Sequence, residues 1–397
     1  MQQFLEAYIK KVENIDIVDD YIHRAYGKEP IYKVSLITGY PGIAMTLFSI
    51  YQHTKNFKYY KLANKYLEKT IDLISSVPIY STSLFEGAFG VIFSLLICSD
   101  LGNNYSEIIK SLLSEYKKIA SDEIRDLKKN IKEGKVESQD YDIVSGCSGT
   151  LSVLLLATDI YPSLYDYLNI EISQLSSILE KLVYEYNEID NEQNTLFSDL
   201  GYAHGMPGVI NILCNSYKRG YKTSKTKDIL INSISKLNRS LKIDNGTIYI
   251  PTDTNNTNNF RDAWCYGMPS VAYTIYNIAK TFQISSLLEL SQNLLYQTWL
   301  RKEYETKLIS PTLCHGFSGI VIISLIMNNE DLANKYIDKI NNTDVDDKDM
   351  LFFDINSNSS IMKDIGLLNG NSGILLTMLS FNNKDIQLNH WSKFLIF

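Results

Sequence analysis

The chain has 397 residues, of which 45% are hydrophobic and 21% charged, and its formal net charge at pH 7 is −7. Such a mildly acidic chain argues against nucleic acid as the main partner, because binding a phosphate backbone requires a basic face. The N-terminus has no secretion-signal pattern, and no segment holds about 18 uninterrupted apolar residues, so we predict no membrane-spanning helix and at most peripheral membrane association.

The chain contains five cysteines, Cys98, Cys147, Cys214, Cys265 and Cys314. Their number is odd and they are widely spread, which does not resemble the disulfide framework of a secreted protein. We therefore expect a cytoplasmic protein with reduced thiols. Cys98 and Cys214 lie inside apolar runs and Cys147 follows a glycine, so core packing is the better interpretation for these three.

One short pattern occurs seven times along the chain: a glycine, two residues, a second small residue and then an apolar run. Its copies follow one another at intervals of 48 to 62 residues, which indicates a repeat architecture. The second small residue is Ser270 in the fifth copy and glycine in the others, and we expect only a minor local change there. The first glycines of the copies are Gly39, Gly87, Gly146, Gly205, Gly267, Gly316 and Gly370.

The run after each pair of small residues is apolar nearly all round, which predicts a helix that is buried on most of its surface. Between these runs lie helical patterns with one polar face, for example over residues 59–75, 106–124 and 284–300. An amphipathic helix is typical of an outer layer, with one face on the core and the other in water. Each repeat is therefore predicted to supply one inner and one outer helix, which gives seven of each.

Two arrangements agree with such repeats, an open solenoid and a closed ring. The inner helices are too apolar on all sides to line an open groove, so we predict an all-α fold, a double-layered α/α toroid formed by residues 1–397 as a single domain. Each glycine pair stands where a loop enters an inner helix, and its spacing puts both small residues on one face. Glycine there permits a tight turn and a close approach of the neighbouring helix.

Two segments depart from the helical pattern. Residues 241–259 contain Asn-Gly between β-rich residues, which predicts a small β-hairpin followed by a loop over one mouth of the ring. Residues 128–142 are predicted to form another loop on the same side. The long intervals also leave room for a small inserted subdomain within 100–141 or 241–262.

If the repeats superpose, equivalent positions lie in a circle at one end of the ring. Cys265 and Cys314 both stand two residues before a first glycine, and His315 stands directly before one. Because they belong to adjacent repeats, we expect them to meet. Two thiolates and one imidazole, with an open fourth position, suit a catalytic Zn²⁺. The alternative is two core cysteines and a helix-capping histidine.

Further candidates stand at or near the same mouth. His204 directly precedes the first glycine of its repeat, as His315 does, and without a neighbouring cysteine it suits acid/base work better than ligation. The alternative for His204 is a polar rim residue. Asp142 and Arg261 stand a few residues before first glycines, and each is a site candidate or an ordinary loop charge. Tyr266 holds a repeat position facing the cavity, although an aromatic there can also be wall packing.

Four segments resemble the lanthionine synthetase C-like family, and in particular its stand-alone lantibiotic cyclases. They are DIVSGCSG from Asp142, YAHGMPG from Tyr202, RDAWCYGMPS from Arg261 and CHGFSG from Cys314. Through the seven glycine repeats the resemblance covers essentially the whole chain. Ser270, in place of the usual glycine, departs from the family pattern but affects no ligand.

The resemblance implies a double α/α toroid that holds one zinc ion at its mouth. The family's zinc ligands correspond to Cys265, Cys314 and His315. Its acid/base histidine corresponds to His204, and its supporting residues correspond to Asp142, Arg261 and Tyr266.

The implied activity is zinc-dependent cyclisation. Peptide cysteine thiols add to dehydroalanine or dehydrobutyrine and form lanthionine or methyllanthionine thioether rings in a lantibiotic precursor. The implied partners are the dehydrated precursor peptide and a modification complex with a dehydratase and an exporter. The implied location is the cytoplasm, with recruitment to the inner face of the membrane left open.

Three alternatives remain at this point. A family member that adds glutathione to dehydrated residues would use the same zinc and thiol chemistry with a different nucleophile. A zinc-dependent prenyltransferase is another α/α ring, but it needs a carboxylate zinc ligand for which the sequence offers no candidate. A non-catalytic peptide-binding scaffold would have no need for a metal.

Overall fold

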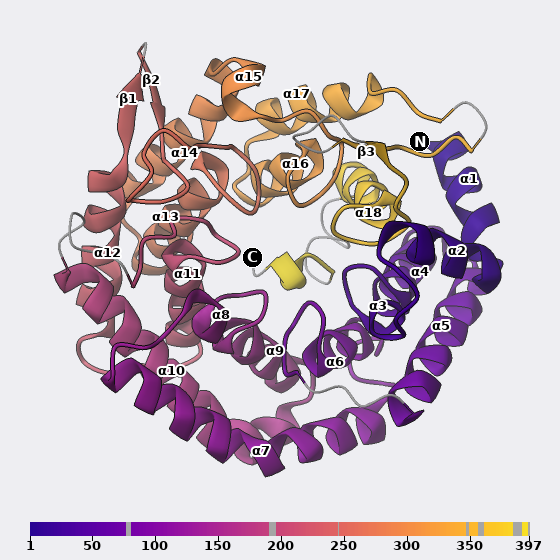
Figure 1. The fold of residues 1–397 in the computed structure, drawn as a ribbon, viewed down its shortest axis with the longest axis horizontal. Coiled ribbons are helices and arrows are strands. Elements are labelled where there is room, and N and C mark those ends of the chain that lie inside the picture. Colours follow the sequence, from indigo (N-terminus) through magenta and orange to yellow (C-terminus); the bar gives the residue numbers. More distant parts are fainter. Residues whose placement is uncertain are drawn as a thin grey trace.

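A computed structural model describes residues 1–76, 81–189, 196–244, 246–346, 349–355, 361–383 and 391–395. Its helices form two concentric layers that close into a ring, as Figure 1 shows. The fold is the predicted double-layered α/α toroid. No helix in the part of the chain that is described has the length and apolar character needed to cross a membrane.

The inner layer consists of helices that begin directly after the first glycine of each repeat, which acts as the N-terminal flanking residue in every case. Their residues are almost all buried, as their all-round apolar sequences predict. The inner helices are α4 (Tyr40–Thr54), α6 (Ala88–Ile97), α9 (Cys147–Ile160), α11 (Met206–Lys218), α13 (Met268–Phe282), α16 (Phe317–Ile326) and α18 (Asn371–Asn382).

The outer layer consists of amphipathic helices that bury one face against the inner layer. Six of them follow an inner helix in the chain. These outer helices are α5 (Phe57–Ser76), α7 (Ser106–Lys132), α10 (Tyr165–Glu188), α12 (Thr226–Ser240), α14 (Ser285–Leu300) and α17 (Glu330–Asn341).

The outer position beside α18 is filled from the other end of the chain, by α1 (Gln2–Val12). The hydroxyls of Tyr8 and Ser372 are hydrogen-bonded at 2.7 Å, and the rings of Phe4 and Phe352 meet edge to face at 4.9 Å. The repeat pattern predicts one inner and one outer helix in every repeat. Instead, α1 takes the seventh outer place, and this packing joins the first and last repeats.

Short elements occupy the connections. The remaining helices are α2 (Ile15–Ala25), α3 (Ile31–Val34), α8 (Ser138–Tyr141) and α15 (Glu303–Thr306), with 3₁₀ turns η1 (Pro162–Leu164) and η3 (Trp391–Leu395). Two antiparallel hairpins pair β1 (Lys242–Asp244) with β2 (Thr247–Tyr249) and β3 (Asp354–Ile355) with β4 (Ile361–Met362).

The hairpin predicted near residue 245 is confirmed, with Lys242 opposite Tyr249, although the turn residue Asn245 lies outside the described residues. The loop predicted over 128–142 is partly wrong. Helix α7 continues to Lys132 because Ile131 carries its buried stripe one turn further, and α8 follows. Of the two ranges with room for an inserted subdomain, 100–141 holds α7 and α8, and 241–262 holds the β1–β2 hairpin and a loop.

The loops that precede the inner helices are joined by backbone hydrogen bonds in a closed circle. Each loop donates an N–H to the loop of the next repeat, over N···O distances of 2.7 to 3.3 Å, and the last loop donates back to the first. Every acceptor is a residue that stands two positions before a first glycine, so the predicted register is confirmed. The accepting carbonyls belong to Ile37, Phe85, Val144, Ala203, Cys265, Cys314 and Leu368.

The second glycine of a repeat lies against the preceding repeat. A Cβ atom on Gly90 would stand 2.5 Å from the carbonyl oxygen of Leu84 and 2.9 Å from Cβ of Leu36. The predicted close packing is therefore present. In the fifth repeat, which has Ser270, the first glycine Gly267 has a φ of +93°, whereas the other six first glycines have negative φ. Only a minor local change is expected in this repeat. The structure has a left-handed backbone there, at Gly267, directly after Tyr266.

The centre of the ring is filled by the end of the chain. Figure 1 shows the C-terminal segment inside the ring of inner helices. Trp391, Phe394 and Leu395 of η3 are fully buried, and the Phe394 ring lies 6.0 Å from that of Phe85 and 6.3 Å from that of Phe93. The axis of the toroid is therefore a packed core, and any site open to substrate lies at a mouth of the ring.

Replacing Gly90 by alanine is expected to lower the free energy of unfolding by about 1–3 kcal/mol, because the added methyl overpacks the contact between the first two repeats. Ser270→Ala is the matched control. A Cβ atom already exists at that equivalent position, and its hydroxyl makes only a 3.4 Å contact with the Gly267 carbonyl, so a loss of about 1 kcal/mol or less is expected. Denaturant unfolding measures both, and a Gly90→Ala variant as stable as wild type would contradict the packing described.

Candidate active site

Two cysteines occupy neighbouring positions in the backbone circle. The amide of Cys265 donates to the carbonyl of Cys314 at 3.3 Å, and their side chains share a hydrogen bond. That bond lowers the pKa of the Cys265 thiol to about 7 against the opposing effect of burial, and the positive charges of Arg261 and His315 lower it further. The same bond and burial raise the pKa of Cys314 well above its usual range. The pair therefore holds one readily ionised sulfur.

His315 is oriented by a carboxylate that the sequence analysis did not identify. Its Nε2 lies 2.9 Å from Oδ1 of Asp354, and the same oxygen accepts from the hydroxyl of Ser310 at 2.9 Å. Asp354 belongs to β3 and is only 5% exposed. A carboxylate on one ring nitrogen is the usual support for a metal-binding histidine, because it fixes the ring and leaves the other nitrogen as the ligand.

The donor set fits zinc in its chemistry. Two thiols from adjacent loops and an imidazole oriented through its Nε2 match the sulfur and nitrogen ligands of a catalytic zinc site. As the side chains stand, no three His, Cys, Asp or Glu residues in the described ranges form a metal-binding group. The structure thus brings Cys265 and Cys314 together and puts His315 within electrostatic range of Cys265.

His204 and Asp142 form a second pair at the same mouth. Nδ1 of His204 lies 2.7 Å from Oδ2 of Asp142, while Oδ1 of Asp142 accepts from the amides of Ser145 at 2.7 Å and Gly146 at 2.8 Å. Asp142 is 2% exposed, whereas the side chain of His204 is 43% exposed. The hydrogen bond with Asp142 raises the pKa of His204 against the effect of burial. This is a fixed, solvent-facing imidazole that holds its proton to higher pH than a free one.

Tyr266 is bound by another residue that the sequence analysis missed. Its hydroxyl donates to Oδ2 of Asp199 at 3.1 Å, and Oδ1 of Asp199 accepts from the amide of Gly201 at 2.6 Å. Burial, and then the charge of Asp199, raise the pKa of Tyr266 well above its usual range. Tyr266 therefore keeps its proton. Asp199 also helps to raise the pKa of His204, which places all three groups in one electrostatic environment.

Arg261 lies at the same mouth as the cysteine pair. Within the described part of the chain its Nε is buried without a hydrogen-bond partner. Its positive charge acts on the Cys265 thiol, so it lies beside the cysteine pair. The cavity next to it, of about 420 Å³, is lined by Asp199, Thr252, Asp253, Asn259, Arg261, Tyr266 and Lys307.

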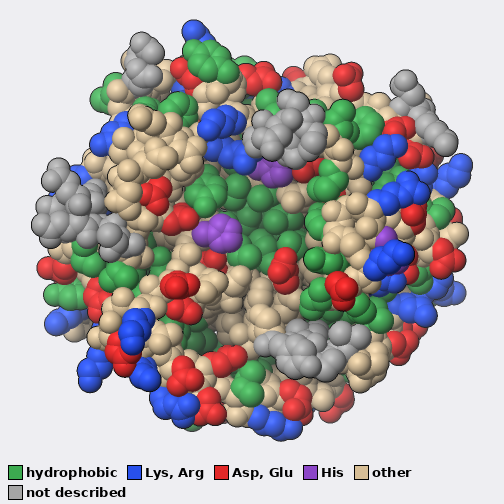
Figure 2. Space-filling model, in the orientation of Figure 1, with side chains coloured by type: hydrophobic (Ala, Val, Ile, Leu, Met, Phe, Trp, Pro, Cys, Tyr) green, Lys and Arg blue, Asp and Glu red, His purple; other side chains and the backbone are tan. Residues whose placement is uncertain are grey.

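The space-filling view agrees with an open mouth. Figure 2 shows histidine side chains at the rim of a central hollow whose floor is hydrophobic. A flexible peptide can approach such a hollow from solvent, with apolar side chains on the floor and polar groups at the rim.

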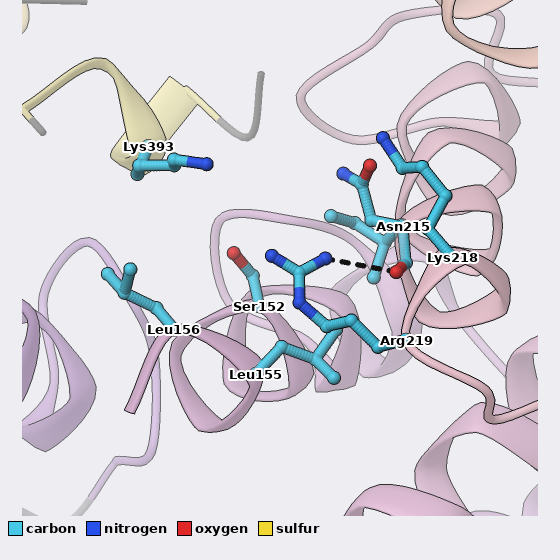
Figure 3. Close-up of a pocket in the computed structure, with 8 residues that line it drawn as sticks. Ser152, Leu155, Leu156, Asn215, Lys218, Arg219 and Lys393 are labelled. Carbon is cyan, nitrogen blue, oxygen red and sulfur yellow. Dashed lines mark hydrogen bonds between the residues drawn. The ribbon is translucent and has the colours of Figure 1, made fainter. Parts of the chain in front are cut away.

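A different pocket, shown in Figure 3, contains none of the predicted site residues. It has a volume of about 70 Å³ and lies between α9, α11 and η3, near the carboxyl ends of the inner helices α9 and α11. Lys218 and Arg219 end α11 there, where cations complement the helix dipole. The predicted site residues lie before the amino ends of the inner helices, at the opposite mouth.

The two residues missed by the sequence analysis differ in how far they were predictable. Asp199 stands six residues before Gly205, the same offset that Arg261 has before Gly267, so the repeat register contained a signal for it. Asp354 follows no repeat position. It reaches His315 through the β3–β4 hairpin, which has no periodic signal of its own.

Comparisons with known proteins identify the family and the fold of the chain. A family model described as lanthionine synthetase C-like protein matches residues 30–396. The nisin biosynthesis protein NisC of Lactococcus lactis subsp. lactis is 24% identical over an alignment of 393 residues. The match covers 92% of this chain and 89% of that protein. A solved structure titled nisin cyclase superposes with a TM-score of 0.75 at 22% identity, over 98% of this chain and 96% of that one.

The pKa of His204 is expected to lie above the ordinary imidazole value of about 6.5 and to fall towards it in Asp142→Asn. Because the folded-state pKa is raised, the pairing stabilises the fold fully at pH values below the ordinary one. That stability is lost as the pH rises through the raised pKa. Asp140→Asn, which removes a nearby carboxylate without a bond to His204, serves as the control. NMR titration of the imidazole measures all three proteins, and an unchanged pKa in Asp142→Asn would contradict the pairing.

Proposed function

Because the chain belongs to the lanthionine synthetase C-like family, we propose that it is a lantibiotic cyclase. In this proposal it adds peptide cysteine thiols to dehydroalanine or dehydrobutyrine and forms lanthionine or methyllanthionine rings. The observation that carries the proposal is the pairing of Cys265 with Cys314 beside the His204–Asp142 pair, at the mouth of a toroid. Such a mouth gives a flexible precursor peptide access to both pairs.

We further propose that Cys265, Cys314 and His315 hold one zinc ion, with Asp354 orienting the histidine. Bound there, zinc would supply an open fourth position at which a substrate thiol loses its proton near neutral pH. The two protein thiolates would cancel the charge of the ion and so would leave a substrate sulfur at that position electron-rich and nucleophilic. Three neutral ligands would leave a less reactive sulfur.

His204 handles the proton that completes the reaction. When the substrate sulfur bonds to the β-carbon, the electrons of the double bond move into an enolate, which must take a proton at its α-carbon. Asp142 raises the pKa of the imidazole, so it holds that proton to higher pH than an unpaired histidine would. Asp142 is fixed by two backbone amides and holds the ring in one orientation, so the proton is delivered to one face of the enolate.

Arg261 and Tyr266 assist from the adjacent cavity. The guanidinium of Arg261, whose Nε has no hydrogen-bond partner among the described residues, stabilises the oxygen on which negative charge develops in the enolate. Tyr266, held by Asp199, contributes a hydrogen bond or a proton relay.

The setting of the reaction is the one that the family resemblance implies. We propose that residues 1–397 act as one cytoplasmic domain on a precursor whose serines and threonines a dehydratase has already dehydrated. The dehydratase and an exporter would work with it in a modification complex, at the inner face of the membrane where the exporter resides.

His204→Ala is expected to slow ring closure on a dehydrated precursor peptide by about 10²–10⁴-fold and to weaken stereochemical control, because proton delivery falls to solvent. Mass spectrometry with chiral analysis of the thioether products, without added glutathione, measures both effects. His23→Ala, on α2, is the control and should retain wild-type rate. Full-rate, stereochemically clean closure by His204→Ala would refute its role. A wild-type protein that closes no ring in this assay and forms only glutathione adducts once glutathione is added would favour the glutathione-adding alternative.

A further inference from the structure

The loop that leads into α11 brings three site groups together. It carries Asp199, Gly201 and His204 within six residues. The loop curls on itself, because the amide of Gly205 donates to the carbonyl of Gly201 at 2.9 Å and the amide of Met206 approaches the carbonyl of Asp199 at 3.4 Å. As a result, the carboxylate of Asp199 is anchored within a few residues of the imidazole that the proposed reaction uses.

Both oxygens of this carboxylate are engaged. Oδ1 accepts from the amide of Gly201 at 2.6 Å, which fixes the side chain to its own loop, and Oδ2 accepts from the hydroxyl of Tyr266 at 3.1 Å. Rotation of the Asp199 carboxylate would break both bonds. The hydroxyl of Tyr266 therefore meets an acceptor of fixed position and direction.

Gly201 provides the space that the tyrosine ring occupies. A Cβ atom on this glycine would stand 2.4 Å from Cε1 and 2.6 Å from Cδ1 of Tyr266. The backbone of Gly201 has no positive φ, so the requirement for glycine here comes from the ring and not from the turn. Asp199 and Gly201 thus fix Tyr266 at both its hydroxyl and its ring.

This geometry determines what Tyr266 can offer a substrate. A phenol has one O–H group to donate, and here it donates its hydrogen bond to Asp199. The remaining hydrogen-bonding capacity is the lone pair of the phenolic oxygen, beside a cavity of about 420 Å³ that both residues line. An acceptor at this place suits a peptide N–H of the substrate.

We propose that Asp199 is a positioning residue that holds Tyr266 as a hydrogen-bond acceptor for a backbone N–H of the dehydrated peptide. This proposal rests on the proposed cyclase function and goes beyond it. It assigns Tyr266 to peptide binding and leaves proton delivery to His204. The inferred ligand is a main-chain amide next to the reacting residue, which every precursor sequence supplies.

The test compares Asp199→Asn, Tyr266→Phe and their combination. Each single variant is expected to lower kcat/KM by about tenfold, the effect of losing a hydrogen bond to a charged group, and mainly through a higher KM. The combined variant should be no slower than either single one, because Asp199 acts through the tyrosine hydroxyl. Effects that multiply, a fall confined to kcat, or an unchanged Asp199→Asn variant would each overturn the proposal.

Asp253→Asn is the matched control. Asp253 lines the same cavity and carries the same charge, but it accepts from the hydroxyl of Ser198 at 2.8 Å and the amide of Asn255 at 2.6 Å and has no bond to Tyr266. It should remain within about twofold of wild type, since its loss changes the charge of the cavity and leaves the tyrosine in place. A tenfold loss in Asp253→Asn would show that charge alone matters and would overturn the positioning role.

A second readout does not depend on cyclase activity. With 3-fluorotyrosine incorporated at position 266, the ¹⁹F resonance should move in Asp199→Asn and stay in place in Asp253→Asn. An unmoved resonance in Asp199→Asn would refute the contact itself. If the wild-type protein closes no ring while the resonance responds as expected, it is the proposed function that fails, and the two failures are thereby distinguished.

Discussion

The circle of backbone hydrogen bonds at one mouth of the toroid is the constraint on which the rest of the structure depends. Each repeat contributes a carbonyl two residues before its first glycine, and the circle closes when the seventh loop bonds back to the first. Closure requires neighbouring inner helices to approach closely, which the second glycines permit. Helix α1 fills the outer position beside α18, with contacts made by Tyr8 and Phe4.

The same circle determines which side chains meet. Sequence neighbours of its carbonyls project from consecutive repeats onto one rim, so the third to sixth repeats place Asp142, His204, Cys265 and Cys314 side by side. The groups are distant in sequence, and no local motif would unite them. Their charges are complementary: the cysteine pair lies beside the cation Arg261, and the imidazole is paired with a buried carboxylate. A site of this kind combines a sulfur-binding position with a proton donor.

Much of this was predictable because the repeat is encoded locally. The glycine spacing and the all-round apolar runs gave the inner helices, and superposing the repeats placed the cysteine pair correctly. The seventh outer helix was not predictable in this way, because α1 belongs to no glycine repeat and reaches its place only on closure. Asp199 was predictable in principle, because it stands six residues before the first glycine of its repeat, as Arg261 does in the next repeat. Asp354 depends on a hairpin contact across the mouth, which single-sequence periodicity cannot reveal.

The proposed chemistry depends on one zinc ion held at this mouth by Cys265, Cys314 and His315. Zinc K-edge X-ray absorption on the purified protein tests it most directly. We expect one zinc per chain with two sulfur ligands at about 2.3 Å and one imidazole nitrogen at about 2.0–2.1 Å. The metal should be lost in Cys265→Ser and Cys314→Ser and kept in Cys214→Ser, whose thiol is buried in α11. Absence of zinc, or a full equivalent retained by both rim variants, would contradict the claim.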